Sequence, residues 1–138
     1  MVVLLDANIV LNHITGREDP YLQASQEIMS LCGHDKVEGY IAFHSVSIIW
    51  YALKIPADQK RAWLKDVCCV LTVVGASHEQ VMEAIAKESF RDFEDCLQDE
   101  CAQSANADYL ITCNKKDFRT AKTKVVTPDE FLQIIEKA

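Results

Sequence analysis

The chain has 138 residues, and its 21 acidic side chains outnumber its 14 lysines and arginines, so the formal net charge is −7. This balance excludes a protein that holds nucleic acid by broad electrostatic attraction, so any contact with nucleic acid must be local or metal-assisted. The length suits a single domain, residues 1–138, whose buried core is large enough to fold without the support of disulfide bonds or bound metal. Six cysteines without a C-x-x-C pair, and no secretory leader or membrane span, predict a reduced, soluble protein of the cytoplasm.

Short apolar runs alternate with helical segments along the whole chain. Strands are indicated by continuous β-branched or aromatic residues, and helices by capping residues, a first-turn proline or a terminal glycine. In chain order these signals predict a strand at 2–5, helices at 8–14 and 19–33, a strand at 39–43, helices at 45–53 and from 56, a strand at 70–74, helices from 78 and at 93–105, strands at 109–112 and 124–126, and a helix from 128. Strands separated by helices predict an α/β fold, a three-layer α/β/α sandwich with a mostly parallel sheet of four to five strands.

Capping residues set the starts of three of these helices. Ser45 is placed to cap the helix at 45–53 with its hydroxyl group. Ser77, with Gln80 three residues later, fits a capping box, and Thr127 followed by proline fits the start of the last helix.

Acidic residues stand where the chain leaves its strands. Asp6 directly follows the first strand, and Asp117 follows a later one. Asp92 and Asp95 are three residues apart on one helical face, which Asp99 extends by a further turn. Because parallel strands end at the same edge of a sheet, we expect these carboxylates to meet there.

Carboxylates gathered in one place repel each other and raise each other's pKa, an effect that proteins usually offset with a divalent cation. Ligands that are all oxygen select Mg²⁺ or Mn²⁺ over zinc. Such a cation suits phosphoryl chemistry, in which it polarises the phosphate and supplies the nucleophilic water. Lys115 and Lys116, beside the predicted cluster, are placed to contact the phosphates of a substrate.

Each candidate also has a structural explanation. Asp92 can be a helix N-cap, Asp95 a first-turn acid and Asp117 a turn residue. His44, at a strand end, is more often a hydrogen-bond partner than a ligand. Asp6 is harder to explain in this way, because carboxylates beside buried apolar runs are uncommon without a partner.

Three segments carry a resemblance to a known family: Leu4–Leu11, Asp92–Gln98 and Ala107–Phe118. Together, in this order and across nearly the whole chain, they resemble the signature segments of PIN domains, particularly the small prokaryotic, VapC-like ones. The resemblance implies a metal-dependent endoribonuclease that uses Mg²⁺ or Mn²⁺ to activate water for attack on an RNA phosphodiester bond.

The resemblance also assigns roles to residues. Asp6, Asp95 and Asp117 correspond to the acidic ligands and catalytic residues of the family, and Asp92 to an accessory metal-binding position. The candidate substrate-binding residues are Asn8, Asn114, Lys115, Lys116 and His44. Many small members of the family are toxins of toxin–antitoxin pairs, which implies an antitoxin as a protein partner in addition to the RNA substrate.

A homodimer is a further implication of the resemblance, because small PIN domains often pair through helices in the region of Trp50, Tyr51 and Trp63. These aromatic residues are interleaved with lysines and an arginine. Such a stretch can stack bases and hold phosphates, although an amphipathic helix more often packs its aromatic side chains in the core or in a dimer interface.

One position departs from the family pattern. Ile48 falls where PIN domains usually carry a glutamate, and no acid between Glu38 and Asp58 replaces it. The loss of one charged ligand predicts weaker metal binding, so the site is either slow, completed by Asp92 or Asp99, or inactive. The alternative function is therefore a degenerate PIN domain that binds RNA or protein.

A phosphatase or phosphoacceptor domain is a third class with an aspartate after its first strand. Haloacid dehalogenase-like phosphatases need a second aspartate where this chain has Asn8. Receiver domains need an aspartate at the end of the third strand, where residues 73–75 have none. The sequence therefore disfavours this class.

Overall fold

A computed structural model describes residues 1–138, which form five strands, seven α-helices and one short 3₁₀ helix. In chain order these are β1 (Val2–Leu5), α1 (Ala7–Thr15), α2 (Leu22–Gly33), β2 (Glu38–Ala42), α3 (Phe43–Ala52), α4 (Ala57–Val70), β3 (Thr72–Val74), α5 (His78–Ala86), α6 (Phe93–Ser104), β4 (Tyr109–Ile111), η1 (Lys115–Phe118), β5 (Val125–Val126) and α7 (Pro128–Lys137). The strands form one sheet in the order β3-β2-β1-β4-β5, and every neighbouring pair is parallel.

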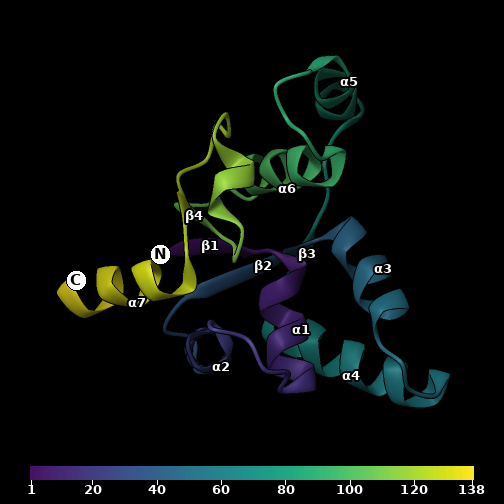
Figure 1. The fold of residues 1–138 in the computed structure, drawn as a ribbon, viewed down its shortest axis with the longest axis vertical. Helices are drawn as coiled ribbons and strands as arrows, with labels where there is room; N and C mark the ends of the chain where they lie inside the picture. The colour runs from purple at the N-terminus through teal and green to yellow at the C-terminus, as the bar shows by residue number, and fades with distance from the viewer.

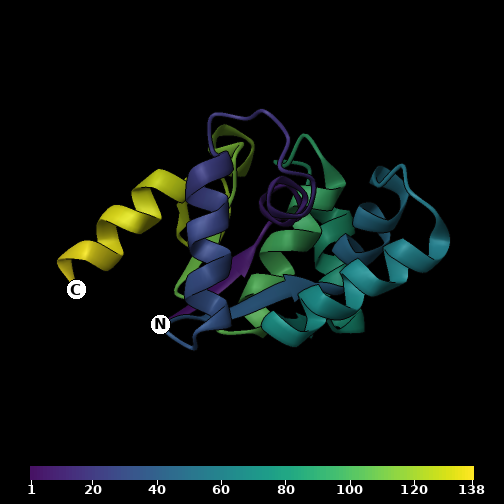
Figure 2. The same ribbon diagram turned by 90° about the horizontal axis from the view of Figure 1, so that it is seen from below.

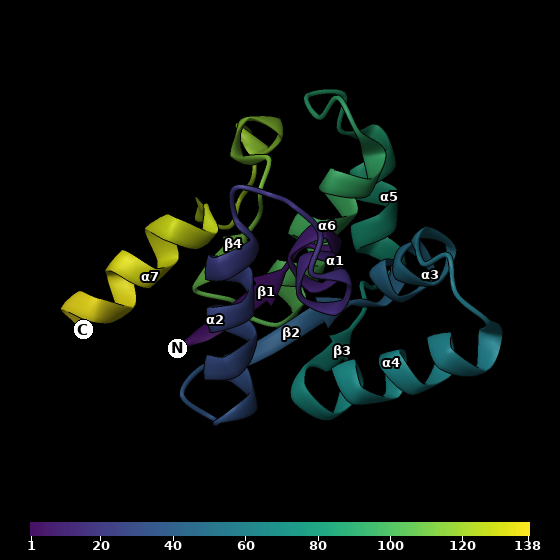
Figure 3. The same cartoon turned by 60° about the horizontal axis from the view of Figure 1, so that its bottom comes forward.

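Helices cover both faces of this sheet. In Figure 1, α5 and α6 lie above the sheet, whereas α1, α2 and α4 lie below it. The view from below in Figure 2 places α2 and α4 in front of the strands. Figure 3 shows α7 beside α2, with which it is in contact, extending away from the sheet to the C-terminus. The predicted three-layer α/β/α fold is confirmed, and the sheet is parallel throughout.

The central strands are buried on both faces, which explains their continuous apolar sequences. Val3, Leu5 and Ile111 belong to the larger apolar cluster, on the side of α1 and α2. Leu4 and Leu110, which alternate with them, pack with residues of α6 on the other side. Helices α1 and α3 directly follow β1 and β2, so their first turns lie at the carboxyl edge of the sheet, where the first turn of α6 also lies.

Two predicted helix starts were wrong in detail. Strand β2 ends at Ala42 and α3 begins immediately after it, so Ser45 lies inside the helix, fully buried, and does not cap it. Helix α2 begins at Leu22, because the Asp19 side chain accepts a hydrogen bond from the amide of Tyr21 and forms a turn before the helix. The capping box of Ser77 and the helix start at Thr127 are confirmed, and Thr127 also forms a capping box with Glu130.

Strand β3 is shorter than predicted. Helix α4 continues to Val70, so only residues 72–74 pair with β2. Cys68 and Cys69 therefore lie on the exposed side of α4 and not beside the strand. None of the helices combines the length and the apolar character needed to cross a membrane.

Candidate functional site

Asp6 is held rigidly at the carboxyl end of β1. It is 8% exposed and caps α1, with its Oδ1 accepting a hydrogen bond from the amide of Ala7 over 2.7 Å. Its Oδ2 accepts a second hydrogen bond, over 2.8 Å, from the hydroxyl of Thr112. Burial raises the pKa of Asp6, and the two hydrogen bonds act in the opposite direction. The carboxylate therefore has a fixed orientation at the edge of the sheet.

Asp95 lies in the first turn of α6, facing Asp6. Its pKa is raised to about 7, first by burial and then by the charges of Asp6, Asp92, Asp117 and Glu94. In the absence of a cation this carboxyl group therefore keeps its proton to a higher pH than an ordinary aspartate does.

These acids surround one cavity, which we call the acidic pocket. It has a volume of about 160 Å³ and is lined by Asp6, Ala7, Asn8, Ile48, Asp92, Glu94, Asp95, Gln98, Asn114 and Asp117. None of its five carboxylates takes part in a salt bridge, because the three salt bridges of the chain join Lys115 to Glu130 and Lys122 to Glu83 and Glu100. The structure thus brings together four of the five aspartates expected to meet, and it adds Glu94.

The wall formed by α3 and the middle of α6 combines Ile48 with Gln98. Ile48 supplies no oxygen ligand to the pocket. Gln98 is 1% exposed and donates a hydrogen bond from Nε2 to the hydroxyl of Ser45 over 2.6 Å. Its Oε1 is buried without a hydrogen-bond partner. Ser45 and Ile48 are one helical turn apart on α3, and Ile48 and Gln98 line the acidic pocket together.

The donor set fits a hard divalent cation. The pocket offers carboxylate and amide oxygens and contains neither histidine nor cysteine, which is the chemistry that Mg²⁺ and Mn²⁺ prefer. The orphaned Oε1 of Gln98 is a further acceptor that lacks a donor. No three His, Cys, Asp or Glu side chains lie close enough together to hold a metal ion in the present arrangement.

Two of the acids have structural roles. Asp92 is the N-cap of α6, where its Oδ1 accepts a hydrogen bond from the amide of Glu94, and it also lines the acidic pocket. Asp99 was expected on the same face as Asp95, but it lies outside the pocket. Its buried carboxylate accepts hydrogen bonds from the amides of Lys122 and Thr123, over 2.8 and 3.0 Å. Of the two acids considered for completing the site, Asp92 and Asp99, the position of Asp99 therefore excludes it.

The expected substrate-binding residues divide into two groups. Asn8 and Asn114 line the acidic pocket, and Lys116 lines the adjoining pockets. Lys115 instead pairs with Glu130 on α7, with 3.1 Å between Nζ and Oε1, and lines none of these pockets.

His44 faces an apolar pocket formed by α3 and α4, together with Phe43 and Trp50. Burial lowers its pKa, and Glu94 opposes this effect. Its Nε2 is buried without a hydrogen-bond partner. His44 is thus not part of the acidic pocket.

A family model described as PIN domain matches residues 2–116. The chain belongs to the PIN domain family. This confirms the resemblance drawn from the three sequence segments, and it explains the parallel sheet with acids at its carboxyl edge. No curated protein matches the chain.

Solved structures share the PIN fold with this chain. VapBC2 from Rickettsia felis, bound to a DNA fragment from its promoter, is 20% identical with a TM-score of 0.66, over 92% of this chain and 98% of that one. VapBC-1 from nontypeable Haemophilus influenzae is 18% identical with a TM-score of 0.69, over 94% and 99%. FitAcB from Neisseria gonorrhoeae is 12% identical with a TM-score of 0.59, over 91% and 97%. At these identities the likeness is one of fold.

Proposed function

We propose that this PIN domain is a metal-dependent endoribonuclease, with Mg²⁺ or Mn²⁺ bound in the acidic pocket and RNA as its substrate. The observation that carries the proposal is the acidic pocket itself. Five carboxylates face one cavity at the carboxyl edge of a parallel sheet, and no lysine or arginine neutralises them. Membership of the PIN domain family supports the same reading.

Asp6, Asp95 and Asp117 would hold the cation, with Asp92 at the rim. When bound, the cation supplies an activated water and stabilises the charge that develops on the phosphate. Thr112 and the amide of Ala7 hold Asp6 in place, so little reorganisation of this carboxylate is needed.

Gln98 is the residue that we propose takes the place of the missing glutamate. Ile48 supplies no anionic ligand to the pocket, and Gln98, which also lines it, has an Oε1 without a hydrogen-bond partner. A neutral amide oxygen binds a hard cation more weakly than a carboxylate does. We therefore expect weaker metal binding than a site with a glutamate at position 48 would have.

The test is cleavage of single-stranded and structured RNA by purified protein with Mg²⁺ or Mn²⁺. Asp6→Asn should abolish cleavage, because it removes one anionic ligand without changing the shape of the side chain. The proposal fails if the wild type cuts no RNA under these conditions, or if it and Asp6→Asn cut equally.

The second candidate function is a degenerate PIN domain that binds RNA without cutting it, and Ile48 is the observation in its favour. Ile48→Glu separates the two readings. The protein is a degenerate nuclease if Ile48→Glu cleaves RNA and the wild type only binds it. In that case the wild type should bind RNA with the same affinity in chelator as with metal.

For partners, we propose an antitoxin-type protein and a second copy of the chain. The VapBC structures, which are toxin–antitoxin complexes, support the first. An exposed apolar surface on α3 and α4 supports the second, since Phe43 and Tyr51 are each 72% exposed beside Trp50 and Leu64. The six cysteines are free thiols, which agrees with our proposal that the protein acts in the cytoplasm.

A further inference from the structure

We infer that a basic cleft beside the acidic pocket binds the backbone phosphates of the substrate strand, and that Phe93 stacks on a base between the two sites. The inference rests on the proposed function, because it takes RNA as the ligand. It concerns Arg91, Lys116 and Arg119, of which only Lys116 was expected from the sequence.

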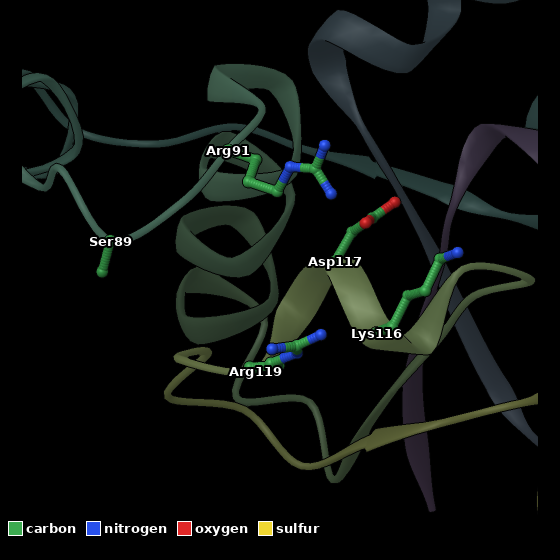
Figure 4. A pocket seen from close by; sticks show the side chains of 5 residues that line it. All are labelled: Ser89, Arg91, Lys116, Asp117 and Arg119. Carbon is green, nitrogen blue, oxygen red and sulfur yellow. The ribbon is translucent and has the colours of Figure 1, made fainter.

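The basic cleft has a volume of about 440 Å³, and no hydrophobic side chain lines it. Figure 4 shows Arg91 reaching into it from the segment before α6, and Lys116, Asp117 and Arg119 from η1 and the residue after it. Ser89 completes the wall. Three cations thus surround a cavity that holds a single carboxylate, that of Asp117.

Two contacts between distant segments build this cleft. Phe90 packs edge-to-face on Phe118, with 6.3 Å between the ring centroids. The hydroxyl of Thr120 donates a hydrogen bond to that of Ser89 over 3.1 Å. Because the aromatic pair joins the two segments, the next residue of each, Arg91 and Arg119, is fixed at the rim of the same cleft.

These cations have no partners within the protein. Arg91, Lys116 and Arg119 make no salt bridge and no side-chain hydrogen bond, although acids outnumber basic residues in the chain. Like charges held close together are unfavourable unless an anion lies between them. Arginine in particular matches the oxygens of a phosphate group with its planar fork of donors.

The basic cleft and the acidic pocket are continuous. A pocket of about 620 Å³ between them shares Arg91 and Lys116 with the cleft, shares Asp92 and Asn114 with the acidic pocket, and shares Asp117 with both. Phe93 lines this intermediate pocket and is 48% exposed. Bases of single strands stack on such exposed aromatic side chains, whereas adjoining cations hold the backbone.

The test is binding of a fluorescently labelled single-stranded RNA, measured by anisotropy in EDTA over a range of salt concentrations, so that neither metal nor cleavage contributes. The triple variant Arg91→Gln, Lys116→Gln, Arg119→Gln should bind at least about tenfold more weakly, and the slope of log Kd against log salt should fall by about 2. The matched control is Lys36→Gln, Lys124→Gln, Lys137→Gln, which removes the same charge from exposed positions elsewhere. Its affinity should stay within about twofold of that of the wild type.

Equal losses in both triple variants would show that only net charge matters and would overturn the inference, as would an unchanged triple variant. Phe93→Ala should weaken RNA binding without changing the salt slope, whereas Phe93→Trp should bind RNA as the wild type does. A Phe93→Ala variant with wild-type affinity for RNA would overturn the stacking role. Failure of the nuclease proposal is recognised separately. In that case the wild type with metal cuts no RNA, while the effect of the cleft variants on RNA binding persists.

Discussion

Thr112 and Asp6, which are 106 residues apart in the sequence, are joined by a hydrogen bond of 2.8 Å between two buried side chains. The same hydroxyl accepts a hydrogen bond, over 3.1 Å, from the amide of Asn114. Thr112 therefore links the carboxylate at the end of β1 to the loop after β4, which carries Asn114 and leads to Asp117. It is a positioning residue that sequence analysis did not single out.

Thr112→Val should lower the stability of the protein by about 1 to 3 kcal/mol, because it keeps the shape of the side chain but leaves an oxygen of the buried Asp6 without its donor. The pKa of Asp6 should rise further, since the hydrogen bond from Thr112 lowers it. Urea unfolding measures the change in stability, and Thr112→Ser is the control that keeps the hydroxyl. If Thr112→Val were as stable as Thr112→Ser, the hydrogen bond would have no structural role.

The stability of the metal-free protein should fall as the pH rises from about 4 to about 7. An aspartate in an unfolded chain ionises near pH 4, whereas the pKa of Asp95 in the folded protein is about 7. Between these values the unfolded state binds fewer protons, so an increase in pH favours unfolding. Thermal unfolding in EDTA at pH 5 and pH 7.5 measures the effect.

Asp95→Asn should flatten this pH dependence and stabilise the metal-free protein at pH 7.5 by about 1 to 2 kcal/mol, after allowance for solvent screening. Asp66→Asn, on the exposed side of α4, is the matched control and should follow the wild type. A wild-type pH dependence retained in Asp95→Asn would locate the effect in another group.

Gln98→Leu should weaken the binding of Mn²⁺ by about tenfold, because it removes the unpartnered amide oxygen of a residue that lines the acidic pocket. Gln98→Glu and Ile48→Glu should each strengthen binding by restoring an anionic ligand. Isothermal titration with Mn²⁺ gives these affinities without reference to activity.

Ser45→Ala is the control for Gln98, because it removes the hydrogen-bond partner of Nε2 and leaves the amide oxygen in place. It should bind Mn²⁺ as the wild type does. Equal affinities of the wild type and Gln98→Leu would show that Gln98 is only a packing residue.

Topology explains which parts of the site were predictable from the sequence. Asp6 follows β1 and Asp117 follows β4, and the rule that parallel strands end at one edge was enough to bring them together. Asp99 was expected near Asp95 because helical spacing alone places the two on one face. In the structure the backbone amides of Lys122 and Thr123 bind the Asp99 carboxylate instead.

The remaining walls depend on contacts between distant segments. Gln98 lines the acidic pocket because it lies against Ser45 of α3, and Arg91 joins Arg119 because Phe90 packs on Phe118. No local pattern encodes these pairings. Glu94 had a local signal, since it lies between two predicted site acids in the first turn of α6.

The exposed apolar surface of α3 and α4 leads to a prediction about assembly. If the protein is a homodimer through this surface, Phe43→Lys and Tyr51→Lys should each convert it to a monomer, because a buried, unpaired ammonium group is strongly unfavourable in an apolar interface. Sedimentation velocity over a range of protein concentrations measures the change. Ile85→Lys is the control, since Ile85 is 62% exposed on α5, on the opposite side of the sheet. A wild type that is monomeric at every concentration, or a dimer that Ile85→Lys disrupts as strongly as Tyr51→Lys does, would rule out this interface.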